Sequence, residues 1–175
     1  SHAKIVLGEL VGTQVALMHA DATALPFTDV GDAFDGFEGV WTVQTLQHIP
    51  DFARACWEVY RVLKPGGHFN NYSLHNTPFN RTVYRLLGKT FHTEGMVDNG
   101  HYYLARANDS QRMIVEDIFG EVSDRYTECL FHPDLKLDFT GRLGSLIGGL
   151  DARLGSHAWF GRWSARQRSF EVLKK

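Results

Sequence analysis

The chain has 175 residues, enough for one domain with a sizeable buried core, and its 43% apolar and 22% charged content is typical of a globular protein. Eighteen basic and twenty acidic residues give a net charge of -2, so charge offers no argument for nucleic-acid binding. No apolar run approaches the roughly 18 to 20 residues of a membrane span, and the first residues lack a secretory pattern.

The first half of the chain predicts two strands that follow the end of a helix. Residues 3–10 (AKIVLGEL) have the composition of a helix, and Gly12 closes it. Residues 15–18 (VALM) and 39–43 (GVWTV) are short apolar runs that predict buried strands. A proline and a polar loop separate the two runs.

A helix is expected after the second strand, with Asp51 as its N-cap. Apolar residues recur at helical spacing on one face: Phe52, Ala55, Cys56, Val59 and Leu63. Charged residues fall on the opposite face: Arg54, Glu58 and Arg61, of which Arg54 and Glu58 form a pair four residues apart. Pro65-Gly66-Gly67 ends the helix, and residues 68–74 (HFNNYSL) predict a third strand. This alternation argues for an α/β domain with parallel strands.

The second half predicts further strands separated by helices rather than by tight turns. Residues 92–107 look irregular and aromatic. Helices are predicted over 82–87, from a cap at Asp109 or Ser110 to about Gly120, and over 143–154. The expected strands are 122–131 and 164–173.

Three segments occur in an order and at a spacing that resemble a known enzyme family. The first is Asp21–Phe27 (DATALPF), the second is Phe37–Val43 followed by Leu46–Asp51 (LQHIPD), and the third is Arg61–Gly67 (RVLKPGG). Together they resemble class I S-adenosylmethionine-dependent methyltransferases of the ubiquinone-biosynthesis type, with Glu38 where the family usually has aspartate.

The resemblance implies an α/β fold with a Rossmann-like methyltransferase sheet, mostly parallel, in which an antiparallel last strand lies beside the fifth. On this plan residues 15–18, 39–43 and 68–74 are the third, fourth and fifth strands. Residues 122–131 and 164–173 are then the sixth and seventh.

The family's glycine-rich loop and first two strands have no counterpart in the sequence, because Gly8 and Gly12 follow no apolar strand. We therefore expect residues 1–175 to be the C-terminal portion of a single methyltransferase domain. Without those strands the fourth strand would expose an apolar edge, so a fragment folding alone would need a rearranged sheet or a swapped homodimer.

The resemblance implies a cofactor, S-adenosylmethionine, held at the carboxyl ends of the strands. Asp21 and Ala22 would meet the adenine, since a carboxylate accepts from its amine and a backbone N–H serves a ring nitrogen. Thr42, Val43 and Gln44 would line the methionine and adenine side. An aspartate after a strand also serves as a turn or cap residue, and that alternative stays open for Asp21.

His48 is the best-placed candidate for a catalytic base, about one helical turn beyond the fourth strand. It could equally be a helix-start residue that bonds to backbone. Gln47, Tyr72 and His75 are candidates for substrate binding, although Tyr72 and His75 could also be packing or surface residues.

Residues 76–108 form the natural substrate cover, since long loops of this kind often act as lids. Their aromatic content hints at an aromatic or lipid-like small-molecule acceptor, but aromatic residues are more often part of a core. No metal is predicted, because none of the nine histidines has ligand-type spacing with a Cys, Asp or Glu.

The main alternative is a methyltransferase-like domain that lacks catalysis and serves as a partner or scaffold. A nicotinamide-dependent oxidoreductase would need a glycine fingerprint, and a nucleic-acid methyltransferase is disfavoured by charge and by the lack of an Asn/Asp-Pro-Pro-Tyr motif. Two isolated cysteines, Cys56 and Cys129, favour a reducing compartment, and we expect a cytoplasmic location.

Overall fold

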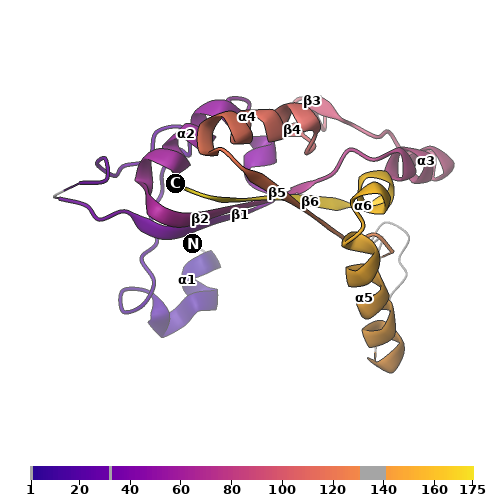
Figure 1. Ribbon diagram of the computed structural model, residues 1–175, viewed down its shortest axis with the longest axis horizontal. Coiled ribbons are helices and arrows are strands. Elements are labelled where there is room, and N and C mark those ends of the chain that lie inside the picture. The colour runs from indigo at the N-terminus through magenta and orange to yellow at the C-terminus, as the bar shows by residue number, and fades with distance from the viewer. Residues whose placement is uncertain (1, 32, 131–140) are drawn as a thin grey trace.

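A computed structural model describes residues 2–31, 33–130 and 141–175, and a four-stranded sheet lies at its centre (Figure 1). The strands, in spatial order, are β1 (Phe37–Val43), β2 (Leu63–Leu74), β6 (Gln167–Leu173) and β5 (Val122–Thr127). β1 and β2 are parallel, whereas β6 is antiparallel to both of its neighbours. The described sheet is therefore mixed: β1, β2 and β5 run in the same direction, and β6, the last strand, runs opposite to them.

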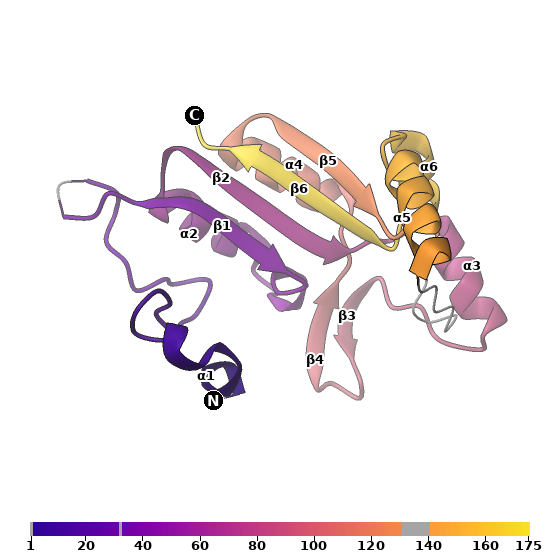
Figure 2. The same ribbon diagram turned by 90° about the horizontal axis from the view of Figure 1, so that it is seen from below.

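Two helices, α2 (Phe52–Val62) and α4 (Asp109–Phe119), cover one face of the sheet, and the other face is open in Figure 2. α1 (His2–Leu7) and α5 (Gly141–Gly155) project on the open side at opposite ends of the molecule. A short 3-10 helix, η1 (Gly8–Leu10), follows α1 directly. The remaining elements gather near the carboxyl ends of β1 and β2: η2 (Leu46–His48), α3 (Pro78–Leu86), β3 (Glu94–Val97), β4 (Tyr102–Ala105) and α6 (Ala158–Ser164).

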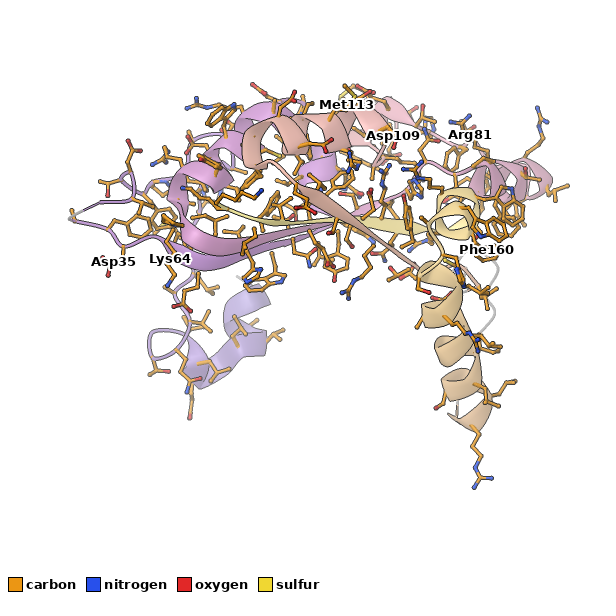
Figure 3. The ribbon with its side chains drawn as sticks, in the orientation of Figure 1. Asp35, Lys64, Arg81, Asp109, Met113 and Phe160 are labelled. Carbon is orange, nitrogen blue, oxygen red and sulfur yellow. The ribbon has the colours of Figure 1, made fainter. Side chains whose placement is uncertain are left out.

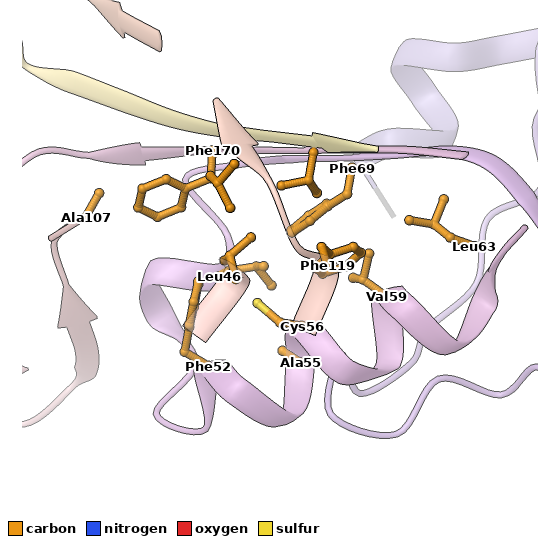
Figure 4. Close-up of a cluster of buried hydrophobic side chains, with 13 residues drawn as sticks. Leu46, Phe52, Ala55, Cys56, Val59, Leu63, Phe69, Ala107, Phe119 and Phe170 are labelled. Carbon is orange, nitrogen blue, oxygen red and sulfur yellow. The ribbon is translucent and has the colours of Figure 1, made fainter. Parts of the chain in front are cut away.

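The main core lies between the sheet and the α2–α4 layer (Figure 4). The predicted apolar face of α2 is confirmed, because Phe52, Ala55, Cys56 and Val59 are all buried there. Aromatic contacts join the layers, with the Phe69 and Phe119 rings stacked at a centroid distance of 5.4 Å. Asp51 caps α2 as predicted, since its side chain accepts a hydrogen bond from the Arg54 amide.

The expected strand over residues 15–18 does not form. Only Val15 makes an isolated bridge, to Val11, and Met18 is 61% exposed. A strand needs a neighbour to pair its backbone groups, and no described strand lies beside this apolar run. The third strand of the predicted plan is therefore missing from the described sheet.

Residues 92–107 contain an ordered β-hairpin rather than an irregular segment. β3 and β4 pair in antiparallel register from Glu94 with Ala105 to Val97 with Tyr102. The turn residues Asp98, Asn99 and Gly100 all have positive φ angles, which Asn, Asp and Gly tolerate best. The Asp-Asn-Gly sequence was the signal for this hairpin, and the prediction missed it.

Several other boundaries also differ from prediction. α3 begins at Pro78 because the Thr77 side chain caps it, and α4 is capped by Asn108. β2 begins at Leu63, β5 ends at Thr127, and Ser164 belongs to α6 rather than to β6. Phe131, the expected end of the sixth strand, lies outside the described residues.

Glu58 lies on the charged face of α2 and pairs with Arg54 as predicted, and its side chain is buried against the segment that precedes the sheet. It accepts hydrogen bonds from the Leu25 amide at 2.8 Å and from the Arg61 guanidinium at 2.7 Å. Arg54 contacts the same carboxylate at 3.3 Å and donates to the Thr23 carbonyl. The hydrogen bond from Arg61 lowers the pKa of Glu58 below its usual value. This carboxylate therefore fixes residues 23–27 along α2.

Replacing Glu58 with alanine should lower the free energy of unfolding by about 1 to 3 kcal/mol, because it leaves the Leu25 amide without its acceptor and removes one of the acceptors of Arg61. Since the pKa of Glu58 is depressed, its contribution is present above the unfolded value of 4.5 and is lost as pH falls through the lower folded value. Urea denaturation at pH 7 and at acid pH would measure both effects. Glu38→Ala, which removes an exposed pair with Lys64, is the control and should leave the midpoint unchanged.

Candidate active site at the carboxyl edge of the sheet

A cavity of about 520 Å³ opens where β1 and β2 end. The turn after β1 contributes one wall, and the segment 76–108 contributes the other. The lining residues are Gln44, Gln47, His48, Leu74, Tyr84, Tyr102, Leu104 and Arg106. Three of the predicted site residues, Gln44, Gln47 and His48, are therefore brought together in one cavity.

The turn after β1 has a backbone conformation that residues other than glycine rarely adopt. Gln44 has a φ of 51°, in the left-handed region, and its amide donates to the Tyr72 carbonyl at 2.7 Å. Such conformations are held in place only by their surroundings and cluster at functional sites. The conformation reverses the chain after β1, so that Gln47 and His48 follow at the edge of the sheet.

Gln47 links the end of β2 to His48. Its side-chain oxygen accepts from the Leu74 amide at 2.8 Å, and its side-chain nitrogen lies 3.1 Å from His48 Nε2. The Leu74 amide can only donate, so the Gln47 oxygen must face it and the Gln47 NH2 group must face the imidazole. His48 Nε2 is therefore the acceptor and carries a lone pair.

His48 Nδ1 lies 2.7 Å from the Tyr103 carbonyl, which can only accept. Nδ1 must therefore carry the proton, which agrees with the assignment made from Gln47. The Tyr102 ring meets the imidazole edge-on at a centroid distance of 5.4 Å. His48 thus joins η2 to the β3–β4 hairpin, which fits the alternative that it bonds to backbone, while its Nε2 keeps the lone pair that a base needs.

The segment 76–108 supplies residues that sequence reasoning did not single out. Arg106 is the only charged residue among those that line the cavity, and 6% of it is exposed. Its guanidinium lies over the Phe91 ring at 4.3 Å and donates to the His92 carbonyl at 2.8 Å. Tyr84 packs edge-on against the same phenylalanine. Of the aromatic residues in this segment, Tyr84 and Tyr102 line the cavity and Phe91 supports Arg106.

The predicted adenine residues lie outside this cavity, in the segment that Glu58 holds. Asp21 is exposed, and its carboxylate accepts from the Thr23 amide and hydroxyl, both at 2.8 Å. These two hydrogen bonds lower its pKa, so the carboxylate is ionised at neutral pH. Ala22 packs partly buried against the main core. Because Arg54 binds the Thr23 carbonyl near the start of α2, this segment and η2 both adjoin the N-terminal end of that helix.

Thr42 and Val43 face different surroundings at the end of β1. The Thr42 hydroxyl donates to the Asn71 side chain at 2.8 Å and so turns toward β2. Val43 is 64% exposed. A cofactor could therefore meet the Val43 side chain, whereas the Thr42 hydroxyl is already hydrogen-bonded.

Tyr72 and His75 do not line the cavity. Tyr72 is half-buried on β2 opposite Ser169. His75 is buried, its ring lies 5.5 Å from that of Tyr126, and burial lowers its pKa to about 4. His75 is therefore neutral at physiological pH and lies in the packed interior beside Arg168.

The described residues contain no cluster of three or more His, Cys, Asp or Glu side chains able to hold a metal ion. Burial raises the pKa of Cys56 to about 12, so its thiol is not a nucleophile at neutral pH. In the described part of the chain, no helix has the length and apolar character needed to cross a membrane.

Comparisons with known proteins identify relatives of the sequence and of the fold. The methyltransferase domain family matches residues 3–70. Methyltransferase GfsG of Streptomyces halstedii is 36% identical over 62 residues, which cover 35% of this chain and 20% of that protein. The 27-O-demethylrifamycin SV methyltransferase of Amycolatopsis mediterranei is 37% identical over 57 residues, which cover 33% of this chain and 19% of that protein. The matched stretch thus spans about a fifth of these relatives.

A similar solved structure is a Thermotoga maritima S-adenosylmethionine-dependent methyltransferase, described as a possible histamine N-methyltransferase. The TM-score is 0.57 at 17% identity, and the match covers 92% of this chain and 65% of that one. The chain therefore has an α/β fold with a mixed sheet that resembles the Rossmann-like methyltransferases, and residues 3–70 match the methyltransferase domain family.

The hydrogen bonds of Gln47 and Tyr103 predict one neutral tautomer of His48, with the proton on Nδ1. Nitrogen-15 NMR of histidine-labelled protein at alkaline pH should show a protonated Nδ1 and an unprotonated Nε2 for His48. His48→Asn identifies the resonance, and Gln47→Leu should alter the Nε2 shift while leaving Nδ1 protonated. A proton on Nε2 in the unaltered protein would contradict the assignment.

Proposed function

We propose that the protein of which this chain is part transfers a methyl group from S-adenosylmethionine to a small-molecule acceptor bound in the cavity beside His48. The observation that carries the proposal is the placement of an oriented imidazole at the carboxyl edge of a methyltransferase-like sheet. Ligands of open α/β sheets bind at this edge. The match of residues 3–70 to a methyltransferase domain supports the same reading.

The residues present fit the adenosyl end of the cofactor. Asp21 offers an exposed, ionised carboxylate whose Oδ1 is held by Thr23, as an acceptor for the adenine amine would be. We propose that Asp21 and Ala22 hold the adenine and that Thr42, Val43 and Gln44 line the path from there to the cavity. When bound, the cofactor supplies a methyl group already activated by its sulfonium.

His48 is proposed as the base that removes a proton from the acceptor. In this structure the Nε2 lone pair accepts a hydrogen bond from the Gln47 side chain. The hydroxyl group of the methyl acceptor would donate to Nε2 in place of Gln47 or alongside it. The Tyr103 carbonyl holds Nδ1 and keeps the imidazole oriented throughout. Gln47 is proposed to contact the acceptor through the same amide group.

The cavity favours a particular kind of acceptor. Tyr84 and Tyr102 offer aromatic surface, and Arg106 offers the cavity's one charged side chain. We propose a small molecule with an aromatic or extended apolar body and a hydroxyl group. The name of the Amycolatopsis relative describes methylation at an oxygen, which supports a hydroxyl acceptor. Residues 76–108 are proposed to cover this acceptor, whereas Tyr72 and His75 have no place in the proposal because neither lines the cavity.

A domain without catalysis is the second candidate, and one observation favours it. Both ring nitrogens of His48 have partners within the protein, as expected of a residue that only tethers the hairpin. Cofactor binding and methyl transfer by the full-length protein distinguish the two candidates. The ubiquinone-biosynthesis type and the cytoplasmic location stay predictions, and the free, buried Cys56 and Cys129 accord with the latter.

Asp21→Ala should weaken S-adenosylmethionine binding by the full-length protein about ten- to hundredfold, because hydrogen bonds to charged groups are among the stronger ones. Isothermal titration calorimetry would measure the dissociation constant. Asp35→Ala is the control, since Asp35 is another exposed aspartate but lies in the loop before β1 (Figure 3). Equal binding by the Asp21 variant and the unaltered protein would remove Asp21 from the cofactor site.

His48→Asn should lower kcat about a hundredfold or more without changing cofactor affinity, because it removes the proton acceptor. The rate would be followed by S-adenosylhomocysteine release with an acceptor found by screening hydroxylated aromatic compounds. His101→Asn, in the turn of the hairpin, is the matched control. An unchanged kcat in the His48 variant would show that the residue only tethers the hairpin.

A further inference from the structure

The α5–α6 unit presents an apolar surface to solvent. On α5, Leu143, Leu146 and Leu150 are 56%, 68% and 54% exposed. At about 100° per residue these three lie within about 60° of one another on the helix surface. On α6, Trp159 is 73% exposed and Trp163 is 46% exposed, and they lie one turn apart. Figure 3 shows α5 projecting away from the sheet with its side chains in solvent.

The opposite side of this unit is firmly attached to the rest of the molecule. Asp151 is buried, and its carboxylate accepts from the Glu128 amide at 3.0 Å and the Leu130 amide at 2.6 Å. A Cβ at Gly155 or Gly161 would collide with Tyr126, so both helices approach β5 closely. The apolar stripe therefore has a fixed orientation relative to the sheet.

The exposed charged residues of the α5–α6 unit are all positively charged. Asp151, the one acidic residue in 141–164, is buried and engaged with backbone amides. The exposed charged residues of this range are Arg142, Arg153 and Arg162. On the helical projection of α5, Arg142 and Arg153 flank the leucine stripe on one side. The surface thus combines leucine and tryptophan with arginine, although the whole chain is slightly acidic.

We propose that the α5–α6 surface docks on an anionic lipid bilayer. Helices that lie in the plane of a membrane bury leucine and tryptophan at the headgroup boundary and present basic residues to anionic lipids. A second copy of the chain is a poorer occupant, because a two-fold contact would bring the same three arginines of both copies together. The α5–α6 unit lies beyond the same edge of the sheet as the β3–β4 hairpin (Figure 2), with α5 on the opposite face of the sheet from that hairpin (Figure 1).

The test measures binding of the full-length protein to vesicles of equimolar phosphatidylglycerol and phosphatidylcholine, without cofactor or acceptor, so it is independent of methyl transfer. The unaltered protein should bind these vesicles and should bind phosphatidylcholine vesicles weakly. Leu146→Ser/Trp159→Ser should lower the affinity about tenfold or more, and Arg142→Gln/Arg153→Gln should lower it severalfold and reduce its dependence on salt. Met113→Ser/Trp57→Ser is the control, since both side chains are exposed elsewhere and Met113 lies on the far side of the molecule (Figure 3).

A second measurement tests the surface with conservative changes. Anionic vesicles should shift the tryptophan emission of the Trp57→Phe variant to shorter wavelength, because this variant keeps both tryptophans of α6. The shift should be lost in the Trp159→Phe/Trp163→Phe variant, which lacks them. Failure of the unaltered protein to bind anionic vesicles would overturn the proposal, as would an equal loss in the control variant. It would also be overturned if sedimentation showed a dimer that the α5–α6 variants dissociate while vesicle binding stays unchanged.

Discussion

The buried amide of Gln47 is the contact on which the geometry of the site depends. Its oxygen accepts from the last residue of β2, and its nitrogen donates to His48, whose other ring nitrogen binds the hairpin. Three hydrogen bonds thus connect the sheet, the turn after β1 and the cover of the cavity. A glutamate here would repel the imidazole lone pair, and a leucine would leave the Leu74 amide unpaired, so few other side chains can serve.

A second buried polar side chain holds the proposed cofactor segment. Glu58 binds residues 23–27 to α2 through the Leu25 amide, and Arg54 and Arg61 complete the contact. This segment has no strand of its own, so its position relies on α2 rather than on a sheet. The same helix begins beside η2. It therefore fixes the positions of both the proposed adenine-binding residues and the turn that bears His48.

The sequence was informative where a local pattern determines the structure. The α2 helix, its cap at Asp51, the strand cores around residues 39–43 and 68–74, and the gathering of Gln44, Gln47 and His48 all follow from spacing and from the resemblance. The burial of Glu58 was not predicted, because helical spacing shows only its own helix and not the loop that packs on it. The strand predicted over 15–18 does not form, because a strand needs a neighbouring strand with which to pair. The place of Arg106 in the cavity could not be predicted, because the fold brings it against the aromatic ring of Phe91.

The central claim is that the segment bearing Asp21 and the cavity beside His48 belong to one methyl-transfer site. A crystal structure of the full-length protein with S-adenosylhomocysteine tests this most directly. The account predicts that the adenine amine binds the Asp21 carboxylate and that the sulfur faces the cavity lined by Gln44 and His48. A cofactor bound away from Asp21, or with its sulfur turned from that cavity, would contradict it.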